Sequence, residues 1–270
     1  MSEADALPDS VPDSVPDSVP THHNTYHLSG RVALVTGASG GLGPAVVVTL
    51  LHAGARVVGV SHSDRPDALA VIERQAGMGT LSQAARERFA WRLADTLDET
   101  AVERLVAGIV AQFGRLDIAV NIVGGFAMGQ PVTELDTGVW DHMLALNTRS
   151  TFLVSKYAAR PMQAQQWGRL VNIASRSAFQ GRRNAAAYAV AKGAVVTLTQ
   201  AQAEELRDAH VTVNAVVPAI FDTPANRAAM PNADYSRWPT PQAIARVIAF
   251  LASDDAALIN GAAIPVYGLA

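Results

Sequence analysis

The chain has 270 residues, is 49% hydrophobic, carries a formal net charge of −3 and contains no cysteine. This length suits one α/β domain, and a mildly acidic charge without a basic cluster argues against nucleic acid or an anionic membrane as partner. The lack of cysteine excludes disulfides and thiolate metal sites and leads us to expect a cytoplasmic protein, and no apolar run reaches the length of a membrane span.

The chain begins with a repeat. Residues 8–19 read Pro-Asp-Ser-Val three times, and proline at every fourth position is incompatible with a helix or a central strand. We therefore predict that residues 1–28 form a disordered tail. His22, His23 and His27 lie in it, and solvation explains them more simply than metal binding, so no metal site is predicted.

From Arg31 onwards, short apolar runs alternate with longer helical patterns. The predicted strands are residues 32–36, 56–60, 89–93, 117–122, 169–173, 211–217 and 263–266. The predicted helices lie near residues 41–53, 98–113, 137–163, 187–209 and 240–252. Continuous apolar runs are typical of strands covered on both faces, so the pattern predicts a single-domain, doubly wound parallel α/β sheet of about seven strands over residues 29–270.

A glycine-rich turn joins the first predicted strand to the first predicted helix. Residues 36–43 read Thr-Gly-Ala-Ser-Gly-Gly-Leu-Gly. Glycines let the backbone approach a pyrophosphate closely, and the free N–H groups and dipole of a helix N-terminus attract it. The turn therefore predicts a nucleotide site.

Tyr188 and Lys192 are four residues apart in a chain with five tyrosines and two lysines. Such a pair would arise by chance only about 0.04 times. On a helix the two side chains share a face, and a nearby cation lowers the pKa of a phenol from its usual value near 10. The pair predicts a tyrosine that exchanges a proton; the alternative is a packed aromatic residue.

The spacing of Gly37, Gly41 and Gly43, together with Tyr188-x-x-x-Lys192, resembles the short-chain dehydrogenase/reductase family. Further matches in family order are Asp95, residues 121–124, Asn147, Ser175, residues 218–223 and Asn260. The resemblance covers residues 29–268. It implies a Rossmann-like fold and an NAD(P)-dependent oxidoreductase that moves hydride between nicotinamide and a carbonyl or alcohol carbon of a small molecule. It also implies a homodimer or homotetramer, with the helix over 137–163 as one contributor to the interface.

The resemblance assigns catalytic roles to four residues. Tyr188 is the implied general acid and base, and Lys192 lowers its pKa and binds the nicotinamide ribose. Ser175 donates to the same substrate oxygen, and Asn147 anchors a water that links Lys192 to solvent. Simpler alternatives are a loop-capping Ser175 and a helix-surface Asn147, but the four residues in family order favour catalysis.

The resemblance also implies a cofactor site. Ser39 and Leu42 would contact phosphate and ribose, Asp95 would accept from the adenine amino group, and Thr223 would reach the carboxamide or pyrophosphate. The predicted cofactor residues are Gly37, Ser39, Gly41, Leu42, Gly43, Ser61, His62, Asp95, Thr96, Asn121, Gly124, Tyr188, Lys192, Pro218, Phe221 and Thr223.

The end of the second predicted strand bears on the choice between NAD and NADP. An acidic residue there binds the ribose 2′-hydroxyl in proteins that prefer NAD, but this chain reads Val60-Ser61-His62-Ser63. Without a carboxylate, Ser61, His62 and Arg65 could donate to a 2′-phosphate, so the sequence favours NADP. The alternative is that His62 and Arg65 are solvated loop residues.

Residues 218–238 are the most distinctive part of the predicted substrate side. This stretch and Gly124-Gly-Phe126 locally resemble dihydropteridine reductases, although Ser175 and the second strand end depart from that pattern. A carbonyl or alcohol oxidoreductase is therefore the first hypothesis and a pterin reductase the enzyme alternative. A non-catalytic nucleotide sensor is the alternative from another class, although a sensor needs no proton relay. Substrate contacts are expected between Ser175, Phe126 and Trp238, under a short lid.

Overall fold

The computed structural model of the protein describes residues 26–63, 65 and 67–270. The three Pro-Asp-Ser-Val repeats, with His22 and His23, lie outside these residues, and so does most of the predicted tail. Packed structure begins at its end: the Leu28 side chain is buried, and its N–H donates to the Ala53 carbonyl at 2.8 Å. Tyr26 packs against Phe250, with ring centroids 5.7 Å apart.

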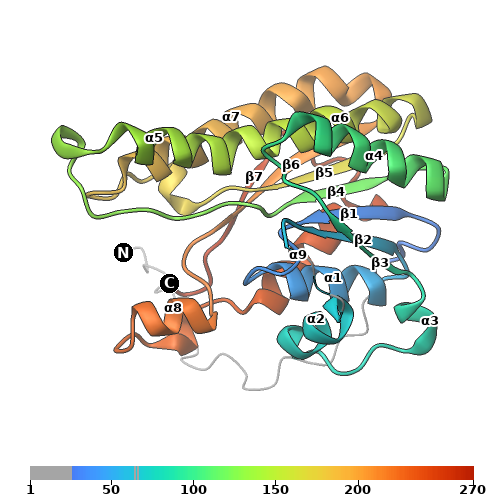
Figure 1. The fold of residues 1–270 in the computed structure, drawn as a ribbon, viewed down its shortest axis with the longest axis horizontal. Coiled ribbons are helices and arrows are strands. Elements are labelled where there is room, and N and C mark those ends of the chain that lie inside the picture. The colour runs from blue at the N-terminus through green and yellow to red at the C-terminus, as the bar shows by residue number, and fades with distance from the viewer. Residues whose placement is uncertain (1–25, 64, 66) are drawn as a thin grey trace, which may run out of the picture.

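One sheet of seven parallel strands forms the centre of the molecule (Figure 1), in the order β3-β2-β1-β4-β5-β6-β7. The strands are β1 (Val32–Thr36), β2 (Arg56–Ser61), β3 (Phe89–Leu93), β4 (Ile118–Asn121), β5 (Gly168–Ile173), β6 (Val211–Pro218) and β7 (Ala263–Val266). The seven predicted strands and the doubly wound sheet are confirmed, with boundaries that differ by no more than one residue. The chain changes direction across the sheet between β1 and β4, which is where such sheets bind ligands.

Helices cover both faces of the sheet (Figure 1). One face carries α1 (Gly43–His52), α2 (Ala68–Ala76), α3 (Gln83–Arg86) and α9 (Pro241–Leu251), and the other carries α4 (Glu99–Phe113), α5 (Thr137–Leu144), α6 (Ser150–Gln165) and α7 (Ala186–Leu206). In β1, Ala33 and Val35 join the core under α1 and α9, whereas Val32 and Leu34 join the core under α4 and α6. Both faces of the strand are buried because successive side chains point to opposite sides, which explains its unbroken apolar run.

The helix predicted over residues 137–163 is not continuous. Helix α5 passes into a π-helical segment, Ala145–Arg149, before α6 begins. A π turn inserts an extra residue and shifts the face on which the side chains lie, and the apolar periodicity of the sequence did not reveal it. Helices α2 and α3 were not predicted, and among residues 26–63, 65 and 67–270 no helix is long and apolar enough to cross a membrane.

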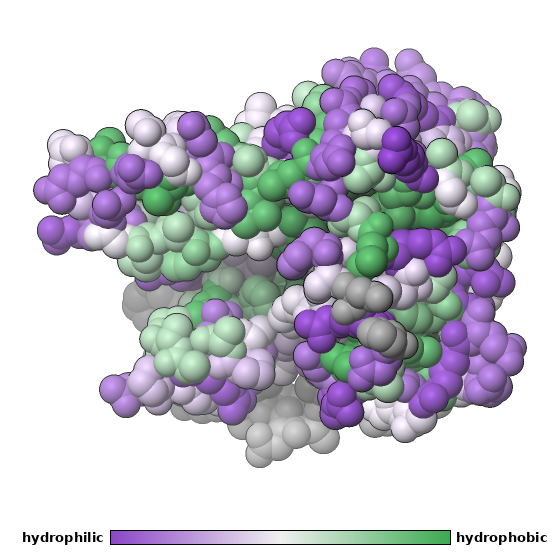
Figure 2. All heavy atoms as spheres, in the orientation of Figure 1, coloured by the Kyte–Doolittle hydropathy of each residue, from purple (hydrophilic) through white to green (hydrophobic). Residues whose placement is uncertain are grey.

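The segment after β6 forms a separate projection. It holds helix α8 (Pro224–Ala229) and a 3-10 turn (Tyr235–Arg237), neither of which was predicted. Figure 1 shows α8 apart from both helical layers, on the side where α5 and its loops also extend beyond the sheet. Figure 2 shows the surface hollowed between these two projections, at the carboxyl ends of the strands.

Candidate active site

The predicted site residues come from many parts of the sequence but gather at one edge of the sheet. Each lies at or beyond the carboxyl end of a strand, or on the helices that follow β4 and β5. Carboxyl ends of parallel strands share one edge, so the fold alone brings these segments together. The geometry of each group decides what the edge can do.

The glycine turn after β1 is held by close backbone contacts. Gly37 has φ +64°, and a Cβ at Gly43 would lie 2.3 Å from the Gly37 carbonyl oxygen and 2.6 Å from Ala38. Neither position accepts a side chain without rebuilding the turn. Helix α1 then begins without a side-chain cap, whereas the Asp98 carboxylate caps α4. The free N–H groups at the start of α1 suit a pyrophosphate, so the turn fits the phosphates of a dinucleotide.

Three serines form a hydroxyl cluster beside this turn. The Ser39 hydroxyl donates to that of buried Ser61 at 3.2 Å, and the Ser61 and Ser63 hydroxyls lie 3.4 Å apart. Nearby in sequence, the buried Arg65 Nε has no hydrogen-bond partner among the described residues. His62 is exposed. The hydroxyl cluster offers donors to a phosphate, and Ser61, the last residue of β2, is not acidic.

The loops after β3 and β4 lie on the two sides of β1. Asp95 is exposed, and one of its carboxylate oxygens accepts the Leu97 N–H at 2.9 Å, while Thr96 is buried. At the end of β4, the Asn121 amide donates to the Ser155 hydroxyl at 2.9 Å and to Asn172 Oδ1 at 2.8 Å.

Leu42, in the glycine turn after β1, was also predicted as a cofactor contact. Its side chain is 2% exposed and packs in the core, so only its backbone can reach a ligand.

Lys192 lies near Tyr188 at the N-terminal end of α7 but turns to the backbone of β5. Its ammonium donates to the Ile173 carbonyl at 2.7 Å, and the residue is 5% exposed. Burial lowers the pKa of Lys192 to about 8, because a charged group loses its hydration there. At neutral pH it is still mostly protonated, so it remains a donor.

Tyr188 differs from the prediction in its electrostatics. Burial raises the pKa of Tyr188, and its interaction with the Ser175 hydroxyl lowers that pKa in part. The net shift is upward, opposite to the lowering that the sequence predicted. The reason is geometric: the ammonium is drawn to the Ile173 carbonyl, and the desolvation of the phenol dominates.

Ser175 caps a turn and also contacts Tyr188. Its hydroxyl accepts the Ser177 N–H at 3.2 Å and so caps the short 3-10 turn Arg176–Ala178. The same hydroxyl interacts with the Tyr188 phenol. Ser175 is 8% exposed, so the cap fixes the hydroxyl beside the tyrosine at little cost in entropy.

Asn147 lies at the centre of the π segment and is fully buried, which excludes a helix-surface amide. Its Nδ2 donates to the Met143 and Gly125 carbonyls at 3.0 and 3.1 Å, and its Oδ1 accepts the Gly125 N–H at 3.2 Å. A Cβ at Gly124 would lie 2.7 Å from Asn147 Oδ1 and 3.2 Å from Lys192 Nζ. The Asn147 side chain and the Lys192 ammonium thus both lie next to Gly124.

The segment after Pro218, the last residue of β6, crosses back over the glycine turn. Thr223 is 6% exposed and caps α8 by accepting the Asn226 N–H, and its methyl group would lie 3.0 Å from a Cβ at Gly41. The Phe221 carbonyl accepts from the Asn226 side chain at 2.8 Å. Trp238, expected to line the substrate pocket, is instead buried against Tyr235.

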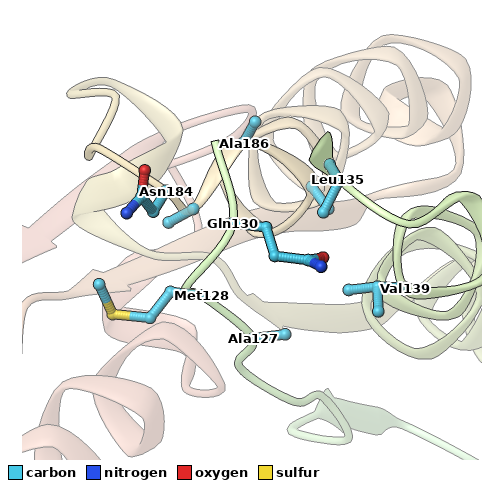
Figure 3. A pocket seen from close by; sticks show the side chains of 9 residues that line it. Ala127, Met128, Gln130, Leu135, Val139, Asn184 and Ala186 are labelled. Carbon is cyan, nitrogen blue, oxygen red and sulfur yellow. The ribbon is translucent and has the colours of Figure 1, made fainter. Parts of the chain in front are cut away.

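A cavity of about 310 Å³ lies beside the start of α7 (Figure 3). Its lining consists of Ala127, Met128, Gln130, Leu135, Val139, Asn184, Ala185, Ala186 and Ala187. None of these residues was predicted as a site residue. Gln130 and Asn184 had a weak signal, since each is a polar residue in a loop that follows a strand end.

Phe126 connects this cavity to Tyr188. The two rings meet edge to face with centroids 4.9 Å apart, and Tyr188 packs in a cluster that also contains Ala127, Leu135 and Ala187. The expectation that Phe126 borders the site therefore agrees with the geometry. One apolar cluster holds the tyrosine ring and forms a wall of the cavity.

Comparison with known proteins gives one family. Residues 31–234 match a family model described as short chain dehydrogenase. Cis-4-hydroxycyclohexanecarboxylate dehydrogenase from Sinomonas cyclohexanicum is 34% identical over 88% of this chain and 95% of its own length. 2-Dehydro-3-deoxy-D-gluconate 5-dehydrogenase from Pseudoalteromonas atlantica is 32% identical over 89% and 96%. A crystal structure of a short-chain dehydrogenase/reductase from Burkholderia xenovorans superposes with a TM-score of 0.79 at 33% identity, covering 90% of this chain and 97% of that one.

Proposed function

The chain belongs to the short chain dehydrogenase family, and on that premise we propose that Tyr188 exchanges the proton of its reaction. The protein is an NAD(P)-dependent oxidoreductase that moves hydride between nicotinamide and a carbonyl or alcohol carbon. When bound, the nicotinamide supplies the hydride or accepts it. In reduction, hydride adds to the carbonyl carbon while the Tyr188 O–H bond breaks and its proton goes to the oxygen.

One observation carries the assignment of roles: the buried Ser175 and Lys192 and the partly buried Tyr188 lie together at the carboxyl edge. Burial raises the pKa of Tyr188 and so keeps the phenol protonated, as an acid must be. Ser175, held by its contact with the Ser177 N–H, donates to the same substrate oxygen and orients it. Lys192, whose pKa is about 8, would hold the nicotinamide ribose and supply the proton that replaces the one given up by the phenol.

Asn147 has a supporting role for Tyr188, Ser175 and Lys192. Its hydrogen bonds to the Gly125 backbone hold the loop after β4 against the π segment. The Asn147 oxygen also borders Lys192 across Gly124, so a water bound there would connect the ammonium to solvent. The residues proposed to hold the dinucleotide are the glycine turn, the first turn of α1, Asp95, Thr96, Asn121 and the Phe221–Thr223 segment.

Replacement of the phenol tests the proposed proton exchange. Tyr188→Phe removes only the hydroxyl and is expected to lower kcat at least about 1,000-fold, because both acid catalysis and the hydrogen bond to the oxygen are lost. NAD(P)H oxidation with a panel of ketones measures the rate, and titration of cofactor fluorescence shows that binding persists. An unchanged rate across the panel would refute the role of Tyr188.

We propose that NADP is the preferred cofactor. The support is the Ser39, Ser61 and Ser63 hydroxyl cluster, the absence of a carboxylate at the end of β2, and the unpartnered Nε of Arg65 within the described residues. NADPH should bind about tenfold more tightly than NADH. Ser61→Asp should reverse the order, because a carboxylate repels the 2′-phosphate and accepts from a ribose hydroxyl. Tighter binding of NADH by the unchanged protein contradicts the proposal.

The remaining proposals concern substrate and assembly. The family supports a small carbonyl or alcohol substrate, which favours neither the pterin reductase nor the nucleotide sensor. We propose a cytoplasmic homodimer or homotetramer, with α6 in the interface, where Phe152 is 43% exposed. We also propose that residues 29–270 are the catalytic domain and that residues 1–28 are an appended tail.

A further inference from the structure

The cavity beside Tyr188 has two walls joined by a backbone hydrogen bond. The Gly129 N–H, in the loop after β4, donates to the Asn184 carbonyl at 2.9 Å, just before α7. Asn184 has φ +61°, a conformation that asparagine tolerates better than most residues. The bond holds the loop of Ala127, Met128 and Gln130 against the start of the helix that carries Tyr188 (Figure 3).

The lining of the cavity has no charge. Seven of its nine residues are apolar, and the other two, Gln130 and Asn184, are neutral amides. Arg182 and Arg183 precede Asn184 in sequence but are exposed and do not line the cavity. A carboxylate or phosphate bound here would lose hydration without gaining a counter-charge from the lining, which disfavours its binding.

Large apolar side chains are exposed on the loops at this edge of the sheet. Phe126, Met128 and Phe179 are 55%, 53% and 57% exposed on the loops after β4 and β5, and Met230, just after α8, is 39% exposed. Exposed aromatic and methionine side chains that gather at a cleft mark a surface on which apolar molecules bind. Phe126 contacts the Tyr188 ring, so this apolar surface reaches the tyrosine.

Gln130 supplies one directed polar group. Its Oε1 accepts the Asp136 N–H at 3.2 Å, which fixes the orientation of the amide. Its Nε2 has no hydrogen-bond partner among the described residues, and Figure 3 shows the amide extending across the cavity towards Val139. An oriented N–H donor in an apolar cavity recognises an oxygen acceptor on the ligand.

We infer that the substrate is a compact, uncharged ketone or secondary alcohol with a mainly apolar body and a second oxygen that accepts from Gln130. The inference rests on the proposed function of Tyr188 and adds the substrate class. It separates this chain from the two relatives described above, whose names specify carboxylate substrates. The carbonyl would face Tyr188 and Ser175, and the second oxygen would lie in the cavity.

Three ketones of similar size test the substrate class. The full chain, supplied with NADPH and with NADH, is assayed with 1,4-cyclohexanedione, cyclohexanone and 4-oxocyclohexanecarboxylate. We expect kcat/KM to be highest for the diketone, about fivefold lower for cyclohexanone, which lacks the second oxygen, and at least about 100-fold lower for the carboxylate. Equal or faster reduction of the carboxylate, or reduction of none of the three, overturns the inference.

A variant with a matched control assigns the effect to the cavity. Gln130→Leu should abolish the preference for the diketone over cyclohexanone. Gln163→Leu, the same change at an exposed position on α6, should leave the preference intact. A preference that survives in Gln130→Leu refutes the role of the amide.

The proposed function can fail separately. A Tyr188→Phe enzyme that retains full activity refutes the proton exchange whichever ketone is preferred. Conversely, an inactive Tyr188→Phe enzyme together with a wild-type preference for the carboxylate refutes only the substrate class.

Discussion

Buried polar groups have charged partners at the amino end of the parallel strands but not at the carboxyl end, among the described residues. At the amino end, Asp117 is fully buried before β4 and accepts from the Val32 N–H and from the Arg31 and Arg115 guanidinium groups. At the carboxyl end, Lys192 is buried and Tyr188 is partly buried, neither has a charged partner among the described residues, and burial shifts both pKa values. At the amino end of the sheet the buried charge of Asp117 is neutralised by guanidinium groups, whereas at the carboxyl end the Lys192 ammonium has no counter-charge among the described residues.

The amino end is reinforced further by an aromatic stack. The Arg31 and Arg169 guanidinium groups lie 3.5 and 4.3 Å from the centroid of the Trp167 ring, and both approach the Asp254 carboxylate. Removing one member of a buried charge pair strongly destabilises a fold. A buried group without a charged partner also costs stability, but its pKa is shifted, and shifted pKa values are typical of catalytic groups. We therefore expect substitutions at the amino end to affect stability and those at the carboxyl end to affect activity.

The largest expected effect is on stability at the amino end. Asp117→Asn keeps the side-chain volume but removes the counter-charge of two guanidinium groups and turns an N–H group towards donors. We expect a loss of about 3 kcal/mol in the free energy of unfolding, measured by urea denaturation. The activity of the folded fraction should stay within about twofold of wild type. A large loss of kcat without loss of stability would remove the distinction between the two ends.

The converse change is Gly124→Ala at the carboxyl end. The new methyl group would lie 2.7 Å from Asn147 Oδ1 and 3.2 Å from Lys192 Nζ, so both side chains must move. We expect kcat/KM to fall about 100-fold, since displacement by an ångström can cost that much, while stability falls by only about 1 kcal/mol. Steady-state kinetics and urea denaturation of the same preparation measure both. Full activity would show that the Asn147–Lys192 arrangement is dispensable.

The smallest expected effect is a pH dependence caused by Lys192. Its folded pKa of about 8 lies below the 10.5 of a free lysine, so between these values the unfolded chain binds a proton that the folded chain has released. The burial cost is complete below pH 8 and is relieved as the pH rises. From pH 8 to 10, wild type should gain about 2 kcal/mol relative to Lys192→Met. If the free energies of unfolding of the two proteins, measured by urea denaturation, changed equally with pH across this range, the assigned burial of Lys192 would be contradicted.

Much of the fold was predictable because the apolar runs in the sequence coincide with the strands of the structure. The apolar runs gave all seven strands to within one residue, since strands buried on both faces must be apolar throughout. The π segment at Ala145–Arg149 was not predictable, because one inserted residue barely changes the apolar periodicity. Helix α8 was missed because its six residues start at a proline and bury no side chain, so they have no apolar face to detect.

The candidate site shows the same division. Gly37 and Gly43 could be identified because a sharp turn beside a helix demands residues without a Cβ, and the spacing of Tyr188 and Lys192 could be identified because a helix fixes it. The direction of the Lys192 side chain could not, because it depends on the Ile173 carbonyl at 2.7 Å on another element. The burial of Trp238 and the cavity at Gln130 likewise depend on contacts between distant loops.

By itself, the sequence determined the sheet, the glycine turn after β1 and the pair of residues proposed to transfer the proton, because these follow from periodicities and spacings along one strand or helix. Only the tertiary structure decided the electrostatics of those residues and the character of the pocket. Desolvation and hydrogen bonding depend on which groups from other elements surround a side chain. For Tyr188, that surrounding raises a pKa that the local sequence predicted to fall.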